Sequence, residues 1–570
     1  MGEPTNAQRN PLLIQEILLI IQPMLSHQDI LSCHRVCRIW NQVFFPSFLW
    51  ESFRIQDPSI VKSLGERYPE LDIIQRNASH IRKLVCRDIR IIQYLIPECC
   101  HLEELDVYSI GSQVAMLLRQ NAQSLKKVSL SLCMEKQIEH RSMKGILRAL
   151  AECVHLEQCE LQLGLAPNHQ LAVVDDEDDE DIDEVDIIQE FYKVVRDIPH
   201  LKISCTGINK PPVPVLGPEA SSLSDSLTTT TSSMSVNPYT SPNFIPQLPK
   251  VQSLYLSENK MSFLSQVQLL QHCQLELVDL TWNFTSFFSR SDPSIQLVDT
   301  LHFQFLKLTT LCMEQCVLKD RDMAMILMAM PSLTRLNLRD TQIGLLSMAV
   351  IVGHAPPPLL GDGVLPTSSQ DPSSQGLRRQ LVELDIRDCL VVESRDILKV
   401  LQTCWKLKIL KAPRIAALDI VQQPHFWVCL GLEELHVGVH AIYRLGSQDA
   451  QRRILHQIGQ LTMLQTLSMM TNLSIHGGHW KSSLYFTIET GLDELRNLKE
   501  LKVFSVDGRS HRAGMKELQW IKENWAKYQL REVTGMRHPA MITASQWDEM
   551  KAYTDQEMPH VTFHDWRPND

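Results

Sequence analysis

The feature that most constrains this chain is a short pattern, Leu-x-x-Leu-x-Leu, which recurs along most of its 570 residues. Apolar residues occupy the first, fourth and sixth places of the pattern, and Val, Ile and Met replace Leu in some copies. Clear copies begin at Leu102, Leu125, Val251, Leu275, Leu308, Leu333, Leu381, Leu432, Leu464 and Leu498. Weaker copies begin at Ile81, Leu156 and Leu407. Such recurrence indicates a repeat protein, in which no repeat is stable alone and stacking buries a continuous core.

The spacing of the copies resembles that of leucine-rich repeats. Leu102 and Leu125 begin 23 residues apart, and Leu308 and Leu333 begin 25 apart, within the usual range of about 20–29 residues. The longer gaps hold insertions, as in irregular repeats of the fungal type. Apolar residues at steps of three and four predict helices between the copies, at residues 143–153, 323–330 and 397–404. The resemblance therefore implies an α/β solenoid, or horseshoe, with a parallel sheet and outer helices.

The cysteines fit the same interpretation. The chain has 15, an odd number spread over its whole length, which does not suggest a small disulfide framework. Cys100, Cys153, Cys273 and Cys404 each precede a copy of the pattern. This placement resembles the cysteine-containing class of leucine-rich repeats. We expect most of these thiols to be reduced and buried.

The first fifty residues carry a separate apolar module. On a helix, Leu13, Ile17 and either Ile20 or Ile21 form one apolar stripe, and Ile14, Leu18 and Leu25 form another. A second helical segment carries Ile30, Cys33, Val36 or Cys37, and Trp40 on one face. A module of about forty residues rarely buries enough surface to be stable alone. It should dock either on another protein or on the rest of its own chain.

This module resembles the F-box motif. The family begins with Leu-Pro-x-Glu-Ile-Leu, and this chain reads LIQEIL from Leu13, with Ile14 in place of the proline. The family continues with Leu-x-x-x-Asp-Leu and Val-Cys-x-x-Trp, and the chain reads LSHQDI from Leu25 and VCRIW from Val36. The Leu49-Trp50 pair resembles the usual ending. The resemblance implies that these helices bind a Skp-type adaptor, and through it a cullin–RING ubiquitin ligase.

The resemblance also assigns roles to residues. The positions that match the family's motif imply an adaptor-binding surface made of Leu13, Ile14, Glu16, Ile17, Leu18, Ile21, Leu25, Ile30, Val36, Cys37 and Trp40. The remainder of such a protein recruits the substrate, and other subunits transfer ubiquitin. The substrate, its modification state, the pathway, the oligomeric state and the effect of Ile14 on adaptor binding stay open.

Composition and charge narrow the location and the ligands. The formal net charge is −11, which argues against a nucleic-acid binder that neutralises phosphates with Lys and Arg. The apolar run near the N-terminus contains Glu16 and Pro23, which favours neither a signal peptide nor a membrane span. Asn6 stands where the myristoylation pattern needs Ser or Thr. We therefore expect a cytoplasmic or nuclear protein that contacts neither nucleic acid nor membrane.

We divide the chain as follows: F-box 10–53, linker helices 54–80, solenoid 81–535 and C-terminal tail 536–570. Insertions at 167–190, 208–247 and 355–377 interrupt the solenoid. The first contains the acidic run DDEDDEDIDEVD, and the others are rich in Pro, Ser and Thr. We expect these insertions to be disordered, because such segments bury too little apolar surface to fold.

The residues between the leucines point to the open face of the expected sheet. This places a candidate substrate-binding surface at Glu104, Asp106, Tyr108, Arg335, Asn337, Arg339, Glu383, Asp385, Arg387, Glu434 and His436, with Glu500 and Lys502 further on. Any single one of these could simply be a solvated sheet residue.

The sequence contains no phosphate-binding loop, nucleophile elbow or HExxH motif, and HGGH at 476–479 is too short for a metal site. We expect no catalytic residue, metal or cofactor. Two interpretations remain: a substrate receptor of a ubiquitin ligase, and a leucine-rich-repeat scaffold whose F-box-like helices only cap the solenoid.

Overall fold

The computed structural model describes most of the repeat region and little of the N-terminal segment. The described residues are 21, 52–55, 75, 77–86, 92–93, 95–108, 111–134, 139–165, 194–196, 198–205, 250–257, 266, 269–270, 272–273, 275–283, 305–353, 377–422, 426–440, 448–469, 484–506, 513–536 and 543–564. They belong to two compact units, residues 1–277 (unit 1) and 278–570 (unit 2).

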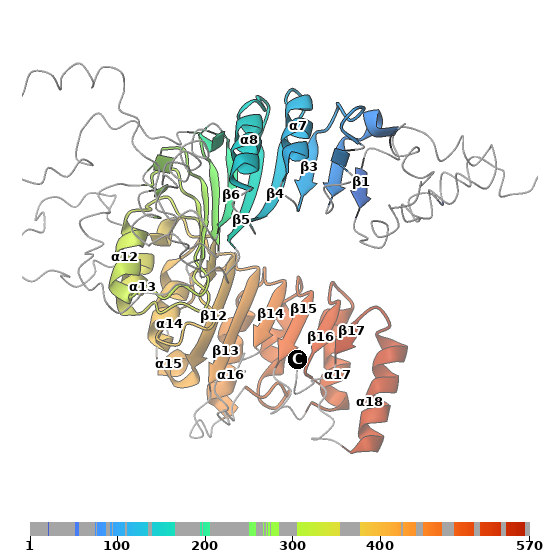
Figure 1. Cartoon of the computed structure of the whole chain (residues 1–570). Coiled ribbons are helices and arrows are strands. Elements are labelled where there is room, and N and C mark those ends of the chain that lie inside the picture. Colours follow the sequence, from blue (N-terminus) through green and yellow to red (C-terminus); the bar gives the residue numbers. More distant parts are fainter. Residues whose placement is uncertain are drawn as a thin grey trace, which may run out of the picture. The chain divides into compact units, whose positions relative to one another are not determined.

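Unit 1 contains a sheet in which each strand pairs in parallel with the next one along the chain (Figure 1). The strands are β1 (Ser52–Ile55), β2 (Lys83–Cys86), β3 (Glu104–Val107), β4 (Lys127–Met134), β5 (Gln158–Leu165), β6 (His200–Cys205) and β7 (Ser253–Ser257). Its helices include α7 (Ser112–Gln120) and α8 (Glu139–Ala151), with the short 3₁₀ helix η4 (Ala78–His80). Parallel pairing of successive strands requires a crossover in every repeat, and the helices supply it.

Unit 2 repeats the same arrangement. Its strands are β8 (Asp279–Trp282), β9 (Thr310–Cys312), β10 (Arg335–Asn337), β11 (Glu383–Asp385), β12 (Ile409–Ala416), β13 (Glu434–His440), β14 (Thr466–Met469), β15 (Val503–Val506), β16 (Glu532–Thr534) and β17 (Thr562–His564). Each is parallel to the next. The α/β fold with a long, open parallel sheet, expected from the repeats, is confirmed.

Helices line one side of the strands of unit 2 (Figure 1). They are α12 (Asp320–Met328), α13 (Leu345–Val352), α14 (Ser394–Thr403), α15 (Ala417–Gln422), α16 (Gln448–Gly459), α17 (Met515–Ile521) and α18 (Ala544–Glu557). Shorter helical turns are η8 (Leu377–Arg379), η9 (Leu492–Asn497) and η11 (Lys522–Ala526). The helices expected at 143–153, 323–330 and 397–404 correspond to α8, α12 and α14. None of the described helices is long and apolar enough to cross a membrane.

The core of unit 2 is built from rows of in-register apolar residues. One row crosses the sheet at Leu311, Leu336, Leu384, Leu410, Leu435, Leu467, Phe504 and Val533, and all of these are buried. Because alternate residues of a strand point to opposite faces, this row fixes the helix-covered face. The residues on either side of it must then lie on the opposite face, which is called the sheet face below.

Three consecutive repeats end their strands in the same way. Gln315, Asp340 and Asp388 have left-handed backbone conformations, with φ of 56°, 54° and 63°. They occupy equivalent places, since Gln315 N donates to Arg339 O and Asp340 N donates to Arg387 O. Left-handed residues turn the chain sharply, and short polar residues tolerate them best. The turn carries the chain from the sheet toward the helical layer.

The place after each turn completes the leucine-rich pattern Leu-x-x-Leu-x-Leu-x-x-Asn/Cys. It is occupied by Cys316, Thr341 and Cys389, all buried. Both Thr341 Oγ1 (2.7 Å) and Cys389 Sγ (3.0 Å) donate to Leu338 O. These small donors satisfy a carbonyl that the turn would otherwise leave buried without a partner.

Among the described residues, eleven cysteines are free, and nine of them are buried. Of the four that we placed ahead of a repeat, Cys153, Cys273 and Cys404 are buried, but Cys100 is exposed and Cys99 is buried instead. Four lie three residues before the first leucine of a strand segment, at Cys99, Cys153, Cys404 and Cys429. At this place the carbonyl of Cys404 accepts from Leu407 N, and that of Cys429 from Leu432 N. A small apolar residue therefore fits the tight turn that enters each strand.

The strand register differs from the sequence alignment in two repeats. Leu275 is half exposed and Leu277 is buried, so the eighth strand follows the frame Leu277, Leu280 and Trp282. The register of β14 with β15 pairs Leu467 with Phe504, so Leu501 holds the first leucine place and Leu498 precedes it. Where several nearby leucines fit the pattern, the sequence alone does not determine which of them holds its first place.

Strand pairing also extends beyond the boundaries that we drew. β1 lies at the junction of the expected F-box and linker and pairs with β2. β17 lies in the expected tail, where α18 leads into it and it pairs with β16. No copy of the pattern was assigned to β6 from the sequence. Ile198, Leu201 and Ile203 nevertheless have the spacing of the pattern, with Ile in place of Leu at the first and sixth positions.

Candidate functional site

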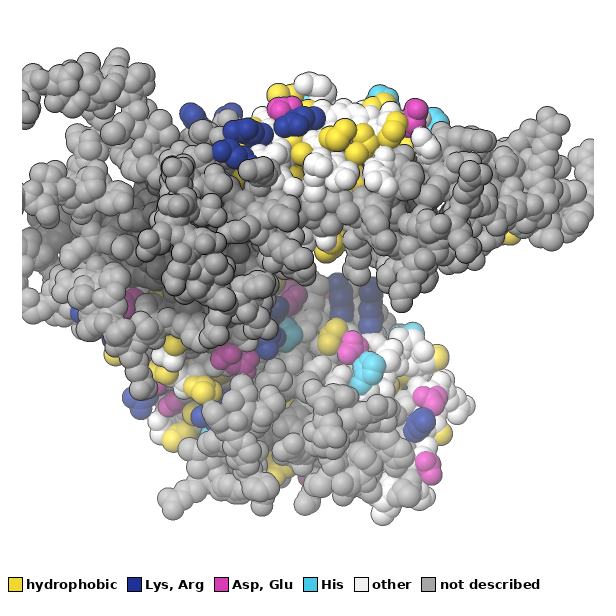
Figure 2. Space-filling view, viewed as in Figure 1, with side chains coloured by type: hydrophobic (Ala, Val, Ile, Leu, Met, Phe, Trp, Pro, Cys, Tyr) yellow, Lys and Arg dark blue, Asp and Glu magenta, His cyan; other side chains and the backbone are white. Residues whose placement is uncertain are grey.

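The sheet face of unit 2 carries a concentration of charged side chains on β9 to β13. In register they form three rows: the first contains Arg335, Glu383 and Glu434, the second Asn337, Asp385, Lys411 and His436, and the third Glu314, Arg339 and Arg387. These ten residues are called the charged face. Figure 2 shows basic, acidic and histidine side chains side by side on the visible surface of unit 2.

Asp385 and Arg387 form the central ion pair of the charged face. Arg387 Nη2 donates to Asp385 Oδ2 at 2.6 Å, and its Nε donates to both carboxylate oxygens at 3.0 and 3.1 Å. Arg387 N also donates to Asp385 Oδ1. The carboxylate raises the pKa of Arg387. Asp385 is only 4% exposed, so this residue positions Arg387 and has little surface of its own to offer.

Arg339 is held from the neighbouring repeat. Its Nε donates to Asp388 Oδ2 at 3.1 Å, while Asn337 Oδ1 accepts from Arg339 N and Asn337 Nδ2 donates to Glu314. The guanidinium uses one of its five donors in this contact, and its terminal nitrogens bond to no other described residue. Arg339 is thus oriented and still able to contact a ligand.

Arg335 and Glu383 are the least constrained charges of the face. They are neighbours in the register of β10 and β11, yet neither makes an ion pair with another described residue. Arg335 is exposed and Glu383 is half-buried. Both side chains are therefore available to form ion pairs with a bound partner.

His436 lies among cations at the far side of the charged face. Burial, followed by the nearby charge of Lys411, lowers its pKa, and Arg387 acts in the same direction. Glu434 Oε2 lies 3.6 Å from His436 Nε2 and 3.9 Å from Lys411 Nζ. An anion bound here would meet Arg387, Lys411 and the imidazole edge together.

The charged face ends abruptly at β14. The sheet-face residues of the next two strands are Thr466, Ser468, Val503 and Ser505, which carry no charge. Within β12, a bulge separates Lys411 from Arg414. It contains Pro413, which has no backbone N–H to donate to the neighbouring strand. The charged face is therefore bounded by the uncharged sheet-face residues of β14 and β15.

Unit 1 carries a smaller set of sheet-face charges. Glu104 accepts from Lys83 Nζ at 2.5 Å and lies 3.5 Å from Lys127 Nζ, and these cations lower its pKa. Asp106 lies two residues on, and Tyr108, which is exposed, donates to its Oδ2 at 3.4 Å. The three residues expected here do lie on one face. The charge of Glu104 is matched by Lys83 and Lys127, whereas Asp106 forms no ion pair with another described residue and its Oδ1 is buried without a hydrogen bond.

Glu500 and Lys502 do not lie with the rest. The corrected register of β15 puts Val503 and Ser505 on the sheet face. Lys502 Nζ donates to Gln465 Oε1 at 2.8 Å, and Glu500 accepts from Gln529. The frame error at Leu498 explains this misplacement. Conversely, Lys411 and Glu314 belong to the charged face but were not among the expected residues. Lys411 lies in a weak copy of the pattern, and Glu314 follows a strand whose own sheet-face residues, Thr310 and Cys312, are uncharged.

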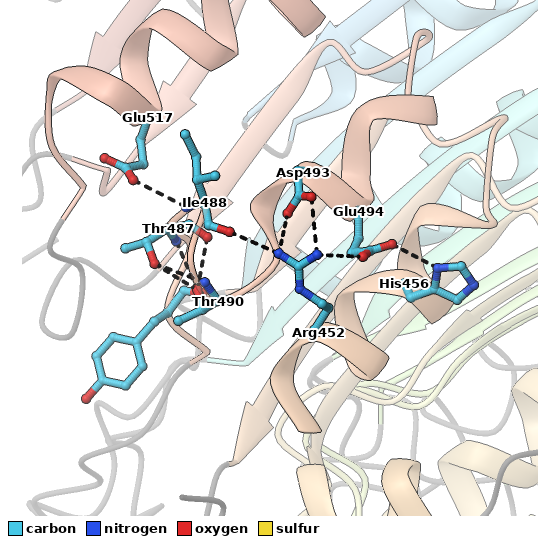
Figure 3. A network of polar contacts seen from close by, with 9 residues as sticks. Arg452, His456, Thr487, Ile488, Thr490, Asp493, Glu494 and Glu517 are labelled. Carbon is cyan, nitrogen blue, oxygen red and sulfur yellow. Dashed lines mark hydrogen bonds and ion pairs between the residues drawn. The ribbon is translucent and has the colours of Figure 1, made fainter. Parts of the chain in front are cut away.

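A second polar cluster lies on the helical side of unit 2 (Figure 3). Arg452 of α16 contacts Asp493 at 3.1 Å and Glu494 at 3.2 Å, both in η9 of the next repeat. His456 Nδ1 lies 3.0 Å from Glu494 Oε2, and Glu517 Oε1 accepts from Ile488 N at 3.3 Å. Each charge is matched by a group of the adjoining repeat, so the cluster ties the helical layer together.

Two kinds of reactive site, metal sites and reactive thiols, were sought among the described residues. No three His, Cys, Asp or Glu side chains among them come together as a metal site. Burial raises the pKa of Cys99, Cys153 and Cys429 to about 12, which disfavours the reactive thiolate. The charged face presents ion pairs suited to recognition of another charged molecule.

The expected adaptor-binding residues lie outside the described part of the chain, except for Ile21, which is helical and half-buried. These are Leu13, Ile14, Glu16, Ile17, Leu18, Leu25, Ile30, Val36, Cys37 and Trp40.

Comparison with protein families identifies an F-box-like segment at residues 15–56. No curated protein matches the sequence. Among solved structures, a leucine-rich-repeat protein of Leptospira interrogans is similar, with 11% identity, 87% of this chain and 99% of that chain covered, and a TM-score of 0.37. A complex of Rad7 and Elc1 from yeast matches with 12% identity, 97% and 96% coverage and a TM-score of 0.34. A complex of TLR13 with ssRNA13 matches with 14% identity, 86% and 78% coverage and a TM-score of 0.33.

Proposed function

We propose that this chain is the substrate-recognition subunit of a Skp–cullin–F-box ubiquitin ligase. The observation that carries the proposal is the F-box-like segment at residues 15–56, placed ahead of a long repeat array. In this assignment the segment binds a Skp-type adaptor, and the adaptor links the chain to the cullin–RING ligase. Ubiquitin transfer is done by other subunits, and the assembly works in the cytoplasm or nucleus.

The charged face is the proposed substrate site. Parallel strands hold its side chains in fixed rows, and loss of side-chain freedom on binding is reduced where Asp385 and Asp388 already orient Arg387 and Arg339. Charges of both signs lie in a defined pattern, and such patterns select partners by electrostatic complementarity. The substrate is therefore a protein surface that presents charges of both signs.

Adaptor binding is the decisive test. The intact chain should co-purify with a Skp-type adaptor when the two are co-expressed. Replacing Ile17, Leu18 and Trp40 together by Ala should abolish this, because interface energy is concentrated in a few buried apolar anchors. The charge reversal Arg335→Glu, in unit 2, is the control and should leave adaptor binding unchanged.

Two results would overturn the assignment. If the intact chain fails to bind the adaptor, the alternative applies, in which the repeat array is an interaction scaffold without a ligase role. If the triple variant keeps the melting temperature of the parent and still binds the adaptor, the F-box-like segment is not the binding element.

A further inference from the structure

Four large apolar side chains are exposed together at one edge of unit 2. Trp405 is 54% exposed, Phe426 78%, Val428 41% and Leu430 56%. They belong to two adjacent repeats, those of β12 and β13. Single exposed apolar residues are ordinary on protein surfaces, but a contiguous group marks a place where another molecule binds.

The repeat geometry brings these residues together. Trp405 and Leu430 occupy the same place in their repeats, two residues before Leu407 and Leu432. Those leucines enter neighbouring, in-register strands, whose backbones lie about 4.8 Å apart. Val428 N donates to Leu401 O at 2.9 Å, which fixes residues 426–430 beside the end of α14. The four residues are called the edge patch.

The backbone that carries the edge patch is anchored in the core. Cys404 and Cys429, directly before Trp405 and Leu430, are fully buried, and each closes a turn through its carbonyl. The exposed side chains are therefore presented by backbone that the core holds in place. A preorganised surface loses little conformational entropy when it binds a partner.

Basic residues flank the edge patch on the side of the β11 repeat. Arg379 holds the place in the β11 repeat that Trp405 holds in the next, and it is exposed. Lys406 Nζ lies 5.0 Å from the centre of the Trp405 ring. Neither Arg378 nor Arg379 forms an ion pair with another described residue. Lys408 is paired with Glu433 at 2.7 Å, the acidic residue next to Leu432. The local sign is opposite to the chain's net charge of −11.

The edge patch is separate from the charged face. Trp405 and Leu430 precede their strands, whereas the charged face begins at the first strand residues, such as Glu434, and extends past the strand ends to Arg387, so the two surfaces share no residue. Trp405 and its neighbours also lie outside the F-box-like segment. A partner that contacts only the edge patch would leave the residues of the charged face unoccupied.

We propose that the edge patch binds an acidic amphipathic segment of another protein. Its apolar side chains lie on Trp405, Phe426 and Leu430, and its carboxylates pair with Arg378, Arg379 and Lys406. The apolar contact supplies most of the affinity, and the basic residues select for acidic neighbours in the sequence of the partner. The inference stands independently of the ligase assignment, since it uses only residues of unit 2.

A designed peptide tests this assignment. The probe is a short fluorescein-labelled peptide with Leu and Phe on one helical face and Glu on the other, and binding to the full-length chain is followed by fluorescence anisotropy. Two companion peptides carry Lys in place of Glu, or Ser in place of Leu and Phe. We expect the acidic amphipathic peptide to bind at least about tenfold more tightly than either companion, and its binding to weaken as salt rises.

Variants then locate the site. Trp405→Ser with Phe426→Ser should weaken binding at least about tenfold, as should Arg379→Glu with Lys406→Glu. All four side chains are exposed, so the melting temperature should hold. Leu306→Ser is the matched control, because Leu306 holds the same place in the β9 repeat and is 62% exposed. It should bind the peptide as the parent does.

Three outcomes would overturn the proposal. The first is no binding of the acidic peptide up to about 1 mM, and the second is equal binding of the lysine peptide. The third is a concentration-dependent dimer, seen by analytical ultracentrifugation, that Phe426→Ser abolishes. In that case a second copy of the chain occupies the edge patch.

Discussion

The carboxylate of Asp320 accepts a hydrogen bond from the backbone N–H of Gly344, at 2.7 Å, across the boundary between two repeats. It also accepts from Leu346 N at 2.8 Å and from Ser347 N at 3.0 Å. Asp320 lies in the first turn of α12, and the three donors lie at the start of α13. One side chain thus caps the helix of the following repeat. This contact links adjacent repeats by satisfying backbone groups that a helix leaves unpaired.

Asp320→Ala should therefore lower the free energy of unfolding by about 2 kcal/mol, at the upper end of measured helix-cap losses. Urea denaturation followed by circular dichroism measures the loss. Asp322→Ala is the matched control: it lies on the same helix, and burial raises the pKa of its carboxyl, so its removal should change stability by less than about 0.5 kcal/mol. Equal stability of the two variants would contradict the capping role.

Gly459 is required by close packing between α16 and the next repeat. A Cβ atom added there would lie 2.2 Å from Glu494 O, a backbone atom that cannot move aside alone. We expect Gly459→Ala to cost several kcal/mol, as overpacked sites do, and to lower the thermal midpoint. Gly431→Ala is the control, since a Cβ there meets nothing within 4 Å. If the two variants melt at the same temperature, α16 packs less closely against the next repeat than Gly459 indicates.

Charge reversal on the charged face should weaken capture of the substrate. Arg335→Glu with Arg339→Glu, and separately Glu383→Lys, alter side chains that the core does not bury. Each should lower affinity about tenfold or more, measured by pull-down of the substrate identified with the intact chain. The melting temperature and adaptor binding should hold. Asp385 is unsuitable for reversal, because its loss would leave Arg387 without its buried partner.

If both variants capture the substrate as well as the parent does, the site lies elsewhere in the chain. The matched control is Lys502→Glu, because that residue lies off the sheet face and contacts Gln465. It should leave capture unchanged.

His272 should make unit 1 sensitive to acid. Burial lowers its pKa from 6.5 to about 4, so the folded chain keeps the imidazole neutral while the unfolded chain protonates it. The stability that depends on the neutral form is complete above pH 6.5 and is lost as the pH falls toward 4. His272→Gln should lose roughly 3 kcal/mol less than the parent over this window.

The pH effect is measured by denaturant titrations of the parent and the variant at several pH values between 4 and 7. The exposed His155, replaced by Gln, is the control and should follow the parent. Parallel pH profiles for the parent and His272→Gln would contradict the assignment.

The strand and helix order was predictable because each repeat carries its own local signal. Leu381, Leu384 and Ile386 are spaced for one strand, and residues 397–404 after them carry apolar residues at steps of three and four, so neither element needed knowledge of distant residues. The frame of β15 was not predictable in this way. Leu498 and Leu501 both fit the pattern and are both buried, and only hydrogen bonding to Gln465 O decides between them.

The candidate site shows the same division. The alternation of the strand by itself put Arg335, Arg339 and Glu383 on one face, since side chains of a strand alternate whatever surrounds them. Which of those charges are free was decided by tertiary structure. Asp385 is covered and committed to Arg387, Arg339 is held by Asp388 from the next repeat, and Arg335 is left exposed.

The sequence by itself determined that this chain forms repeats, because the spacing of the apolar residues within each copy of the pattern determines which side chains of a strand can be buried. Only the tertiary structure decided how one repeat fits the next. The cap from Asp320 to α13, the close approach of Gly459 to Glu494, and the equivalent places of Trp405 and Leu430 before neighbouring strands all involve residues of different repeats. These pairs are separated by 24, 35 and 25 residues in the sequence, and the distances between them in space follow only from stacking of the strands in register.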